Sequence, residues 1–377
     1  MIYTQYLETL KGNFAALSDE RKKQLLRIQK IRKREVLVIA SAISKGPQAA
    51  IDQTDLLPIY DQLETLKGTA LDVILETPGG SGETTEDIVR LLRKGRNEVN
   101  FIIPGVAKSA GTIMVTSGDD ILMGPLSSLG PIDAQVQRDG KLFSAEAFIE
   151  GLNRIKEETD KNSYLNRAYI PILQAISPGE IEAARNALKF GKRLAASWLQ
   201  QYKFKHWETH QSDGRNVTEQ EREERAKEVA ERLGAHSEWL SHNRSIKIED
   251  LQKMGIRVTN YEDVPELADA ILRYHIVLQM SFETNIYKVY ETPTSQILRF
   301  QGAPPPANQP MQELQWQCPS CKNLLKLQLN FVPNVPIQHG RLPFPPDNKL
   351  TCPVCKTQSD LSPVRLHLEA SSKRKIL

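Results

Sequence analysis

The sequence predicts an α/β domain with helical additions, followed by a small C-terminal metal-binding module. Strand and helix patterns alternate between residues 36 and 123, a proline-rich segment follows at 302–310, and all four cysteines lie beyond it. Strands that alternate with helices at this spacing form parallel sheets whose faces the helices cover. The 377 residues are enough for about two domains with a sizeable core.

The composition argues against several classes of protein. Charged residues make up 25% of the chain and hydrophobic residues 40%, and the net charge of +3 gives no overall attraction to nucleic acid or membranes. No segment approaches the roughly 20 apolar residues of a membrane-spanning helix, and the first residues lack the layout of a signal peptide. We therefore expect a soluble, cytoplasmic protein without a membrane span, and we do not expect nucleic-acid binding.

Residues 5–34 form the first predicted helix, and its second half is strongly basic. Eight basic residues fall within 14 positions: Arg21, Lys22, Lys23, Arg27, Lys30, Arg32, Lys33 and Arg34. A run of this kind is usually a solvated helix face, and the alternative is a patch for an acidic partner or a phospholipid headgroup. We treat residues 1–34 as an N-terminal segment ahead of the main domain.

Apolar runs after this segment predict a buried parallel sheet. Val36–Ala40 is a continuous apolar run rich in β-branched residues, which is typical of a strand buried on both faces. Further strand patterns lie at Leu71–Glu76, Val99–Ile103 and Ile121–Met123. Helical patterns lie between and after them, at residues 54–66, 85–94 and 109–116.

The second part of the main domain is predicted to be mainly helical over residues 145–240. Glu219–Leu233 carries dense charge of both signs, which is typical of an exposed helix with i,i+4 pairs. Small helical elements at residues 246–258 and 264–271 complete a domain over residues 35–300. Four prolines within nine residues at 302–310 then predict an extended linker, to which we assign residues 301–315.

Three motifs rich in small residues each follow a predicted strand. Thr77-Pro-Gly-Gly80 lets the backbone turn sharply and exposes its amides. Gly105-Val-Ala-Lys-Ser109-Ala-Gly111 places a serine at the start of a helix, beside free backbone donors that can stabilise the oxyanion of acyl transfer. Gly124-Pro-Leu-Ser-Ser-Leu-Gly-Pro-Ile-Asp133 delivers a carboxylate towards the same edge. Each motif alone is usually a turn or a helix cap, but the three together in this order point to a catalytic site.

With these motifs, residues 35–260 resemble the Clp-protease/crotonase superfamily of serine peptidases. Within it, they are most similar to the serine dehydrogenase proteinase family, whose relatives include signal peptide peptidase and the Clp proteolytic subunit. The resemblance implies a Clp/crotonase-like core of repeated ββα units. It also implies an endopeptidase that forms a homo-oligomer and cleaves a peptide or protein substrate.

The resemblance also implies roles for individual residues. Ser109 corresponds to the nucleophile, and the amides of Gly80 and Ala110 to the oxyanion hole. The family order of serine, aspartate and histidine makes Asp133 the acid and a later histidine the base. His242 matches a family segment in which a histidine precedes a helix that ends in Met-Gly-Ile, so we assign it as the base.

Other bases stay open. His236 is the alternative histidine, and His242 could instead be a surface or helix-capping residue. Histidine suits the role because its unperturbed pKa is about 6.5 and a carboxylate can orient it. A serine–lysine dyad, as in signal peptide peptidase, is the main rival, and its candidate lysines are Lys108, Lys141 and Lys156.

Two matching cysteine knuckles near the C-terminus predict a structural zinc site. Cys318-Pro-Ser-Cys321 and Cys352-Pro-Val-Cys355 are separated by 30 residues, and the 317 residues before them contain no cysteine. Four thiolates satisfy tetrahedral zinc and leave no open position. We therefore expect structural Zn²⁺ in a zinc ribbon, with redox thiols or an iron–sulfur cluster as alternatives.

The zinc-ribbon module is assigned to residues 316–377. Leu324–Phe331 and Val364–Leu368 have strand patterns, and His339 is expected at the surface rather than as a ligand. A module this small lacks a core of its own, so the metal would supply folding energy. Capture of a substrate or partner is its expected role.

Three functional hypotheses follow. The first is a serine endopeptidase that forms an acyl-enzyme on Ser109. The second is a catalytically inactive scaffold that binds a protein partner, because no histidine lies near Asp133 in the sequence. The third is acyl-CoA chemistry on the shared crotonase fold, which is weaker because that chemistry needs no serine nucleophile.

Overall fold

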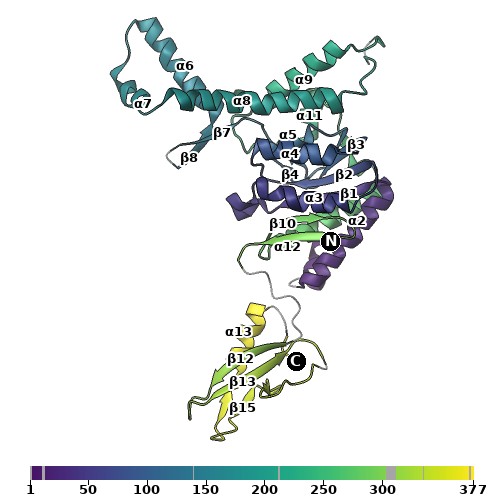
Figure 1. Ribbon diagram of the computed structural model, residues 1–377, viewed down its shortest axis with the longest axis vertical. Coiled ribbons are helices and arrows are strands. Elements are labelled where there is room, and N and C mark those ends of the chain that lie inside the picture. The colour runs from purple at the N-terminus through teal and green to yellow at the C-terminus, as the bar shows by residue number, and fades with distance from the viewer. Residues whose placement is uncertain are drawn as a thin grey trace. The chain divides into compact units, whose positions relative to one another are not determined.

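The computed structural model of the chain describes residues 2–10, 13–138, 140–210, 213–302, 311–333, 335–372 and 375–377. The chain divides into two compact units (Figure 1), one formed by Ser18–Phe300 and the other by Met1–Leu17 together with Gln301–Leu377. Within the described ranges, no helix is both long enough and apolar enough to cross a membrane.

A seven-stranded sheet lies at the centre of the Ser18–Phe300 unit. Its parallel strands, in spatial order, are β1 (Glu35–Ser41), β2 (Ala70–Glu76), β3 (Glu98–Ile103), β5 (Asp120–Met123) and β9 (Thr259–Asn260). On the other side of β1, the antiparallel strands β10 (Ile286–Glu291) and β11 (Gln296–Phe300) extend the sheet. The four strands that the sequence predicts are confirmed, whereas β9, β10 and β11 had no prediction.

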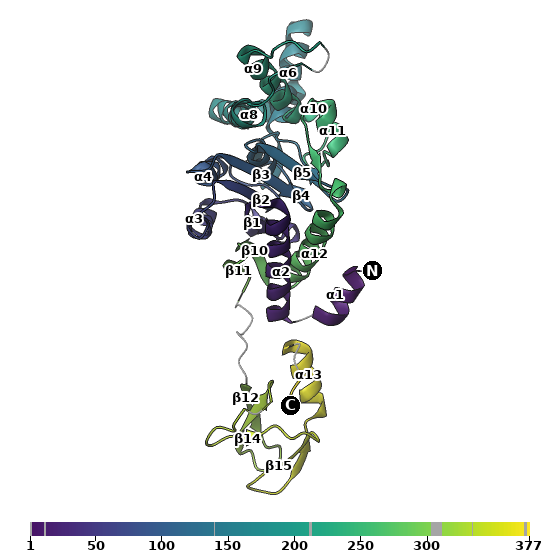
Figure 2. The same ribbon diagram turned by 90° about the vertical axis from the view of Figure 1, so that its right-hand side faces the viewer.

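Helices cover both faces of this sheet. Figure 2 shows α3 (Leu56–Glu64) and α4 (Gly82–Arg93) on one face, and α2 (Phe14–Arg32) and α12 (Pro265–Phe282) on the other. Every second strand residue, such as Leu37, Val73 and Phe101, points to the same face of the sheet. These residues form one hydrophobic core with residues of the helices that cover that face. Burial on both faces explains why the strands are continuous apolar runs, and it confirms the predicted α/β class.

A strand, a short strand and a helix follow one another once in the chain, and the next strand is again followed by a short strand. After β3 come β4 (Val106–Ala107) and α5 (Ala110–Val115), and after β5 comes β6 (Ser128–Leu129). The short strands β4 and β6 pair with each other in a separate parallel ladder.

The predicted helical additions are present between residues 145 and 253. They are α6 (Ala145–Asn162), α7 (Ile170–Gln174), α8 (Pro178–Trp198), α9 (Glu219–Leu233), α10 (His236–Trp239) and α11 (Ile248–Lys253). A hairpin of β7 (Gln135–Arg138) and β8 (Lys141–Ser144) precedes them. Helices α8 and α9 pack into the core through residues such as Leu194 and Val229. By contrast, α12 is much longer than the element predicted at 264–271, because its buried second half lacks an amphipathic period.

The predicted solvated N-terminal segment is corrected in two respects. The single helix expected over residues 5–34 is two helices, α1 (Ile2–Leu10) and α2. From Ser18 onward, α2 packs within the main unit, so a boundary at residue 35 does not follow the packing. Arg21 is fully buried rather than solvated: its Nε lies 2.9 Å from Glu291 Oε1, and its Nη1 donates to Ser281 Oγ at 2.7 Å.

The other unit contains two small sheets and a helix. Strands β12 (Met311–Gln317) and β13 (Leu324–Asn330) pair antiparallel, and β14 (Leu342–Pro343) lies parallel to β13. A second hairpin pairs β15 (Lys349–Thr351) with β16 (Gln358–Asp360). Residues at 364–368, predicted as a strand, instead lie in α13 (Ser362–Ser372), because an alternation of apolar residues over five positions does not distinguish the two structures.

The predicted linker 301–315 is only partly described. Residues 303–310 lie outside the described residues, and residues 311–315 belong to strand β12. His339 is exposed, as predicted.

The buried pair between Arg21 and Glu291 makes a testable prediction about stability. Arg21→Ala should lower the free energy of unfolding by about 3–5 kcal/mol, because it leaves the Glu291 carboxylate buried without its cation. Urea denaturation followed by tryptophan fluorescence measures this. Lys23→Ala is the matched control, since Lys23 is 67% exposed and pairs with Glu20 on the same helix. Equal losses in the two variants would contradict the prediction.

Candidate active site

A ladder of four short backbone segments, which we call the site ladder, brings the sequence motifs together. Its members are Thr77, β4, β6 and Ile246. The Thr77 amide donates to Val106 O at 2.9 Å, and β4 pairs in parallel with β6. Leu129 of β6 then pairs with Ile246 through two hydrogen bonds of 3.0 Å. The residues just beyond each member are therefore neighbours, although they span about 170 positions of the sequence.

Ser109 occupies a strained turn between β4 and α5. Its φ of 51° and ψ of −118° lie outside the regions that non-glycine residues normally adopt. The side chain is half-buried and makes no hydrogen bond with a described residue. Backbone strain of this kind costs about 1–3 kcal/mol and concentrates at functional sites. The turn therefore points to a functional serine rather than to a simple helix cap.

The two glycines of the first motif pack tightly around this turn. Gly79 has φ +102°, and a Cβ there would lie 2.7 Å from Ser109 Cβ and 2.8 Å from Lys108 O. Gly80 has φ +150°, and Ile51 brackets it: the Ile51 amide donates to Gly79 O at 2.7 Å, and Ile51 O accepts from the Ser81 amide at 2.9 Å. Only glycine fits at either position.

The amides predicted to form the oxyanion hole have no internal acceptor. Within the described ranges, no hydrogen bond uses the amide of Gly80 or of Ala110. Ala110 begins α5, where backbone donors lack intrahelical partners. Both donors are thus available to an oxygen outside the protein backbone.

Asp133 is buried and bound by two imidazoles. Its Oδ1 lies 2.7 Å from His242 Nδ1, and its Oδ2 lies 3.1 Å from His236 Nδ1, while Gln135 Nε2 donates to Oδ2 at 3.1 Å. Burial by itself raises the pKa of the Asp133 carboxyl, but the hydrogen bonds and charges of His242 and His236 outweigh burial and lower the pKa below its ordinary value. Asp133 is therefore an ionised carboxylate at neutral pH.

The rival lysines lie elsewhere or are already bound. Lys108 Nζ donates to Leu129 O at 2.9 Å and to Arg244 O at 3.1 Å, so it ties the loop after His242 to the site ladder. Burial, together with the charge of Lys247, lowers the pKa of Lys108 to about 8. Lys141 and Lys156 are both exposed.

A cavity of about 780 Å³ adjoins the Ser109 turn. Ser109, Ala110, Gly80 and Asp133 line one part of it, and helix α8 lines another. His236 and His242 bind Asp133 without lining the cavity, and neither is hydrogen-bonded to Ser109. The structure thus brings four of the five predicted residues to one cavity and joins His242 to it through Asp133. A serine–imidazole contact is often absent or long before substrate binds.

The contact between His236 and Asp133 was not predicted. The sequence suggests His236 only as an alternative base, because 103 positions separate it from Asp133 and no motif connects them. The role of Gln135 also carries no signal in the sequence.

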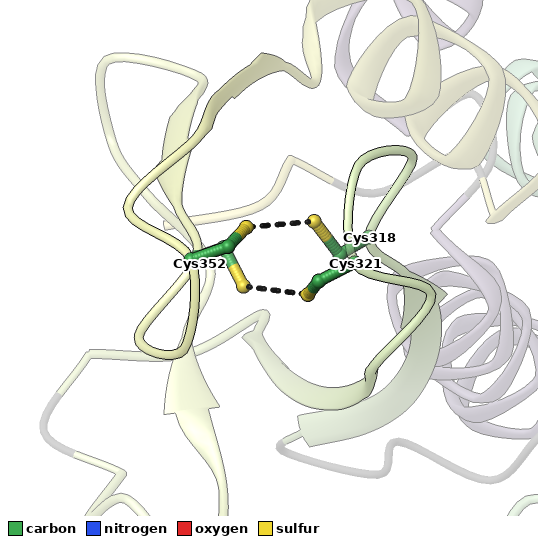
Figure 3. A group of neighbouring side chains, drawn as sticks. Cys318, Cys321 and Cys352 are labelled. Carbon is green, nitrogen blue, oxygen red and sulfur yellow. Dashed lines mark hydrogen bonds between the residues drawn. The ribbon is translucent and has the colours of Figure 1, made fainter.

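The four cysteines form one cluster in the other unit (Figure 3). Their sulfur atoms all lie within 4.8 Å of one another, with Cys318 and Cys355 at 3.6 Å and Cys321 and Cys352 at 3.7 Å. These separations are far beyond the roughly 2.05 Å of a disulfide bond. They match the edge of about 3.8 Å that a tetrahedron of sulfurs has around zinc with bonds of about 2.3 Å. The cluster can therefore hold a metal ion.

The two knuckles have the same backbone geometry. Lys322 and Lys356, each directly after a Cys-Pro-x-Cys turn, have φ of 61° and 62°. In both knuckles the lysine amide donates to the carbonyl of the first cysteine at 3.0 Å. The repeated geometry orients two sulfurs from each knuckle to a common centre.

Comparison with known proteins finds a family model that is similar to part of the main unit. The family model described as ClpP-like SDH-type serine proteinase matches residues 17–166. The match covers less than half of the chain. The matched residues include Gly80, Ser109, Ala110 and Asp133, whereas His236 and His242 lie after the matched segment.

Two uncharacterized proteins from Methanocaldococcus jannaschii are similar in sequence. One is 29% identical over 89 residues, which are 24% of this chain and 30% of that protein. The other is 34% identical over 70 residues, which are 19% of this chain and 24% of that protein. The chain thus aligns with less than a third of the length of either relative.

Several solved structures also resemble the chain. A serine-to-alanine mutant of the 1510-N membrane-bound stomatin-specific protease is 16% identical, with 59% of this chain and 79% of that chain covered and a TM-score of 0.33. A ClpP1 point mutant from Listeria monocytogenes is 12% identical, with 63% and 98% covered and a TM-score of 0.30.

The packing of Gly79 against Ser109 gives a prediction. Gly79→Ala should displace the serine turn, because the added Cβ meets Ser109 and the Lys108 carbonyl and because φ is positive. Reaction of Ser109 with a fluorophosphonate probe should fall by about 100-fold, the cost of misplacing a reacting atom by about 1 Å. Gly95→Ala is the control, since Gly95 also has a positive φ but no heavy atom would lie within 4 Å of its Cβ. Similar labelling of the two variants would contradict this account.

Proposed function

We propose that the protein is a serine peptidase that hydrolyses peptide bonds through an acyl-enzyme on Ser109. The observation that carries the proposal is the convergence of a strained serine, two amides without acceptors and a buried, ionised aspartate around one cavity. Residues that form only a packing core do not need this combination. The match of residues 17–166 to the model of ClpP-like SDH-type serine proteinases supports the same proposal.

In the first half-reaction, Ser109 Oγ attacks the scissile carbonyl carbon. His242 takes the hydroxyl proton on its Nε2, because its Nδ1 faces Asp133 Oδ1 at 2.7 Å. The amides of Gly80 and Ala110 donate to the oxyanion of the tetrahedral intermediate. His242 then returns the proton to the leaving amine, and the peptide bond breaks.

In the second half-reaction, water attacks the acyl-enzyme. His242 removes a proton from the water, and the amides again hold the oxyanion. Collapse of the intermediate releases the new carboxylic acid and regenerates the Ser109 hydroxyl. Closure of the Ser109–His242 hydrogen bond on substrate binding is part of this proposal.

The second candidate function is a catalytically inactive scaffold that binds a protein partner. It is favoured by one observation, namely that Ser109 and His242 are not hydrogen-bonded to each other. Reactivity of the serine distinguishes the two candidates.

The serine peptidase proposal predicts a covalent adduct. Mass spectrometry of the full chain after fluorophosphonate treatment should show one adduct on Ser109, and Ser109→Ala should lose it. His242→Gln should slow labelling by at least about 1,000-fold, because it removes the base of the triad. Ser81→Ala is a control, since Ser81 lines the same cavity but its hydroxyl caps α4 and donates to Glu83. No adduct on the folded wild type would favour the scaffold.

We also propose that the four cysteines hold structural Zn²⁺ in a zinc ribbon. The separations between the sulfurs and the matched knuckle geometry support tetrahedral coordination without an open position. Metal binding would then supply part of the folding free energy of this unit, whose core is small.

The zinc proposal predicts one metal ion per chain. Elemental analysis of the purified protein should give one zinc, and Cys321→Ser should lower both the zinc content and the thermal stability of this unit. Fluorophosphonate labelling of Ser109 should not change in that variant, because the ligands lie outside the Ser18–Phe300 unit. Iron with visible absorption, or full stability without any metal, would contradict structural zinc.

A further inference from the structure

Asp133 shares a single negative charge between two histidines. The carboxylate is 1% exposed, and each of its oxygens faces a different imidazole, Oδ1 facing His242 at 2.7 Å and Oδ2 facing His236 at 3.1 Å. Both imidazoles use Nδ1 for this contact. A triad needs only one of them, so the second imidazole requires its own explanation.

The His236 side chain is partly open to solvent. Its side chain is 25% exposed, so protons reach it from solvent. Its backbone amide donates to the Glu146 carboxylate of α6, which fixes the start of α10 beside Asp133. The nearby charges Arg232 of α9 and Glu238 of α10 pair with each other at 3.1 Å. Asp133 is therefore the anion that faces the imidazole, and Glu146 holds the backbone.

We propose that His236 is a positioning residue that orients the Asp133 carboxylate and, when protonated, disables the Asp133–His242 pair. This inference rests on the proposed serine peptidase function. With Nδ1–H donated to Oδ2, neutral His236 fixes the rotation of the carboxylate and leaves Oδ1 directed at His242. The single charge of Asp133 is then free to stabilise the His242 imidazolium that forms when Ser109 loses its proton.

Protonation of His236 removes that stabilisation. The His236 imidazolium and Asp133 form a neutral pair, so a second imidazolium on His242 would gain little from the same carboxylate. The unperturbed pKa of histidine lies near physiological pH, and ionisable groups that interact strongly release their protons in steps that belong to the pair. One proton on His236 and one on His242 therefore each suppress the reaction. As the pH falls, the reaction rate should decrease more steeply than it would for a triad with a single histidine.

The pH dependence of fluorophosphonate labelling tests this inference on the full chain. For the wild type, the slope of log labelling rate against pH should rise from one to two on the acid side. In His236→Gln the side-chain amide still donates to Asp133 but cannot titrate, so the slope should stay at one. At pH 8 this variant should label within about threefold of the wild type, because the triad itself is intact.

Two further variants separate the roles. His236→Phe keeps a ring but removes the donor, and its labelling at pH 8 should fall by about tenfold or more because the carboxylate loses its orientation. His206→Gln is the matched control, since His206 is an exposed histidine outside the site, and its profile should equal the wild type. Circular dichroism of each variant confirms that it is folded.

The outcomes distinguish failure of this inference from failure of the proposed function. A slope of one for the wild type, or of two for His236→Gln, overturns the role of His236 and leaves the peptidase proposal standing. If His236→Gln loses labelling while His242→Gln retains it, His236 is the base, and the inferred positioning role of His236 is overturned. If the folded wild type is not labelled at any pH, the proposed function fails, and the inference fails with it.

Discussion

The candidate site depends on a ladder whose segments are only one or two residues long. Strands β2, β3 and β5 end at the same edge of the main sheet, and after each of them the chain adds one short pairing to this second ladder. Thr77, Ala107, Leu129 and Ile246 are consequently neighbours. Each residue of the proposed triad and oxyanion hole lies within four residues of one of these positions, whereas His236 reaches the site through α10.

Such a short ladder needs side-chain support to hold a strained serine. Thr112 of α5 supplies it, because its hydroxyl donates to Ala107 O at 2.8 Å and accepts from the Gly130 amide at 2.9 Å. Lys108 adds a second tie between β6 and the loop after His242. These hydrogen bonds hold β4, before the Ser109 turn, and α5, after it, against the segment around Leu129 and Gly130. The cost of its backbone strain, about 1–3 kcal/mol, is thus offset by contacts that lie outside the turn itself.

The main elements could be predicted because local patterns determine them. Strands such as Val36–Ala40 are apolar on both faces, and the three small-residue motifs each follow such a strand. Arg21 shows where local pattern fails, since a basic run predicts a solvated face and only the distant Glu291 makes burial favourable. The pairing of Leu129 with Ile246 likewise depends on segments more than 100 positions apart, which periodicity cannot reveal. The assignment of His242 as the base rests on resemblance and stays a prediction, and only the folded chain brings its ring to Asp133.

The burial of Asp133 constrains what can occupy position 236. An ionised carboxylate that is removed from water needs a donor for each oxygen, or its charge becomes costly. His242 satisfies Oδ1, while Gln135 supplies a neutral donor to Oδ2. His236 is a second donor to Oδ2. The residue at this position therefore lowers the free-energy cost of burying the carboxylate and also affects its orientation. Unlike a glutamine or asparagine at this position, histidine can also carry a charge of its own, which is what the proposed role of His236 uses.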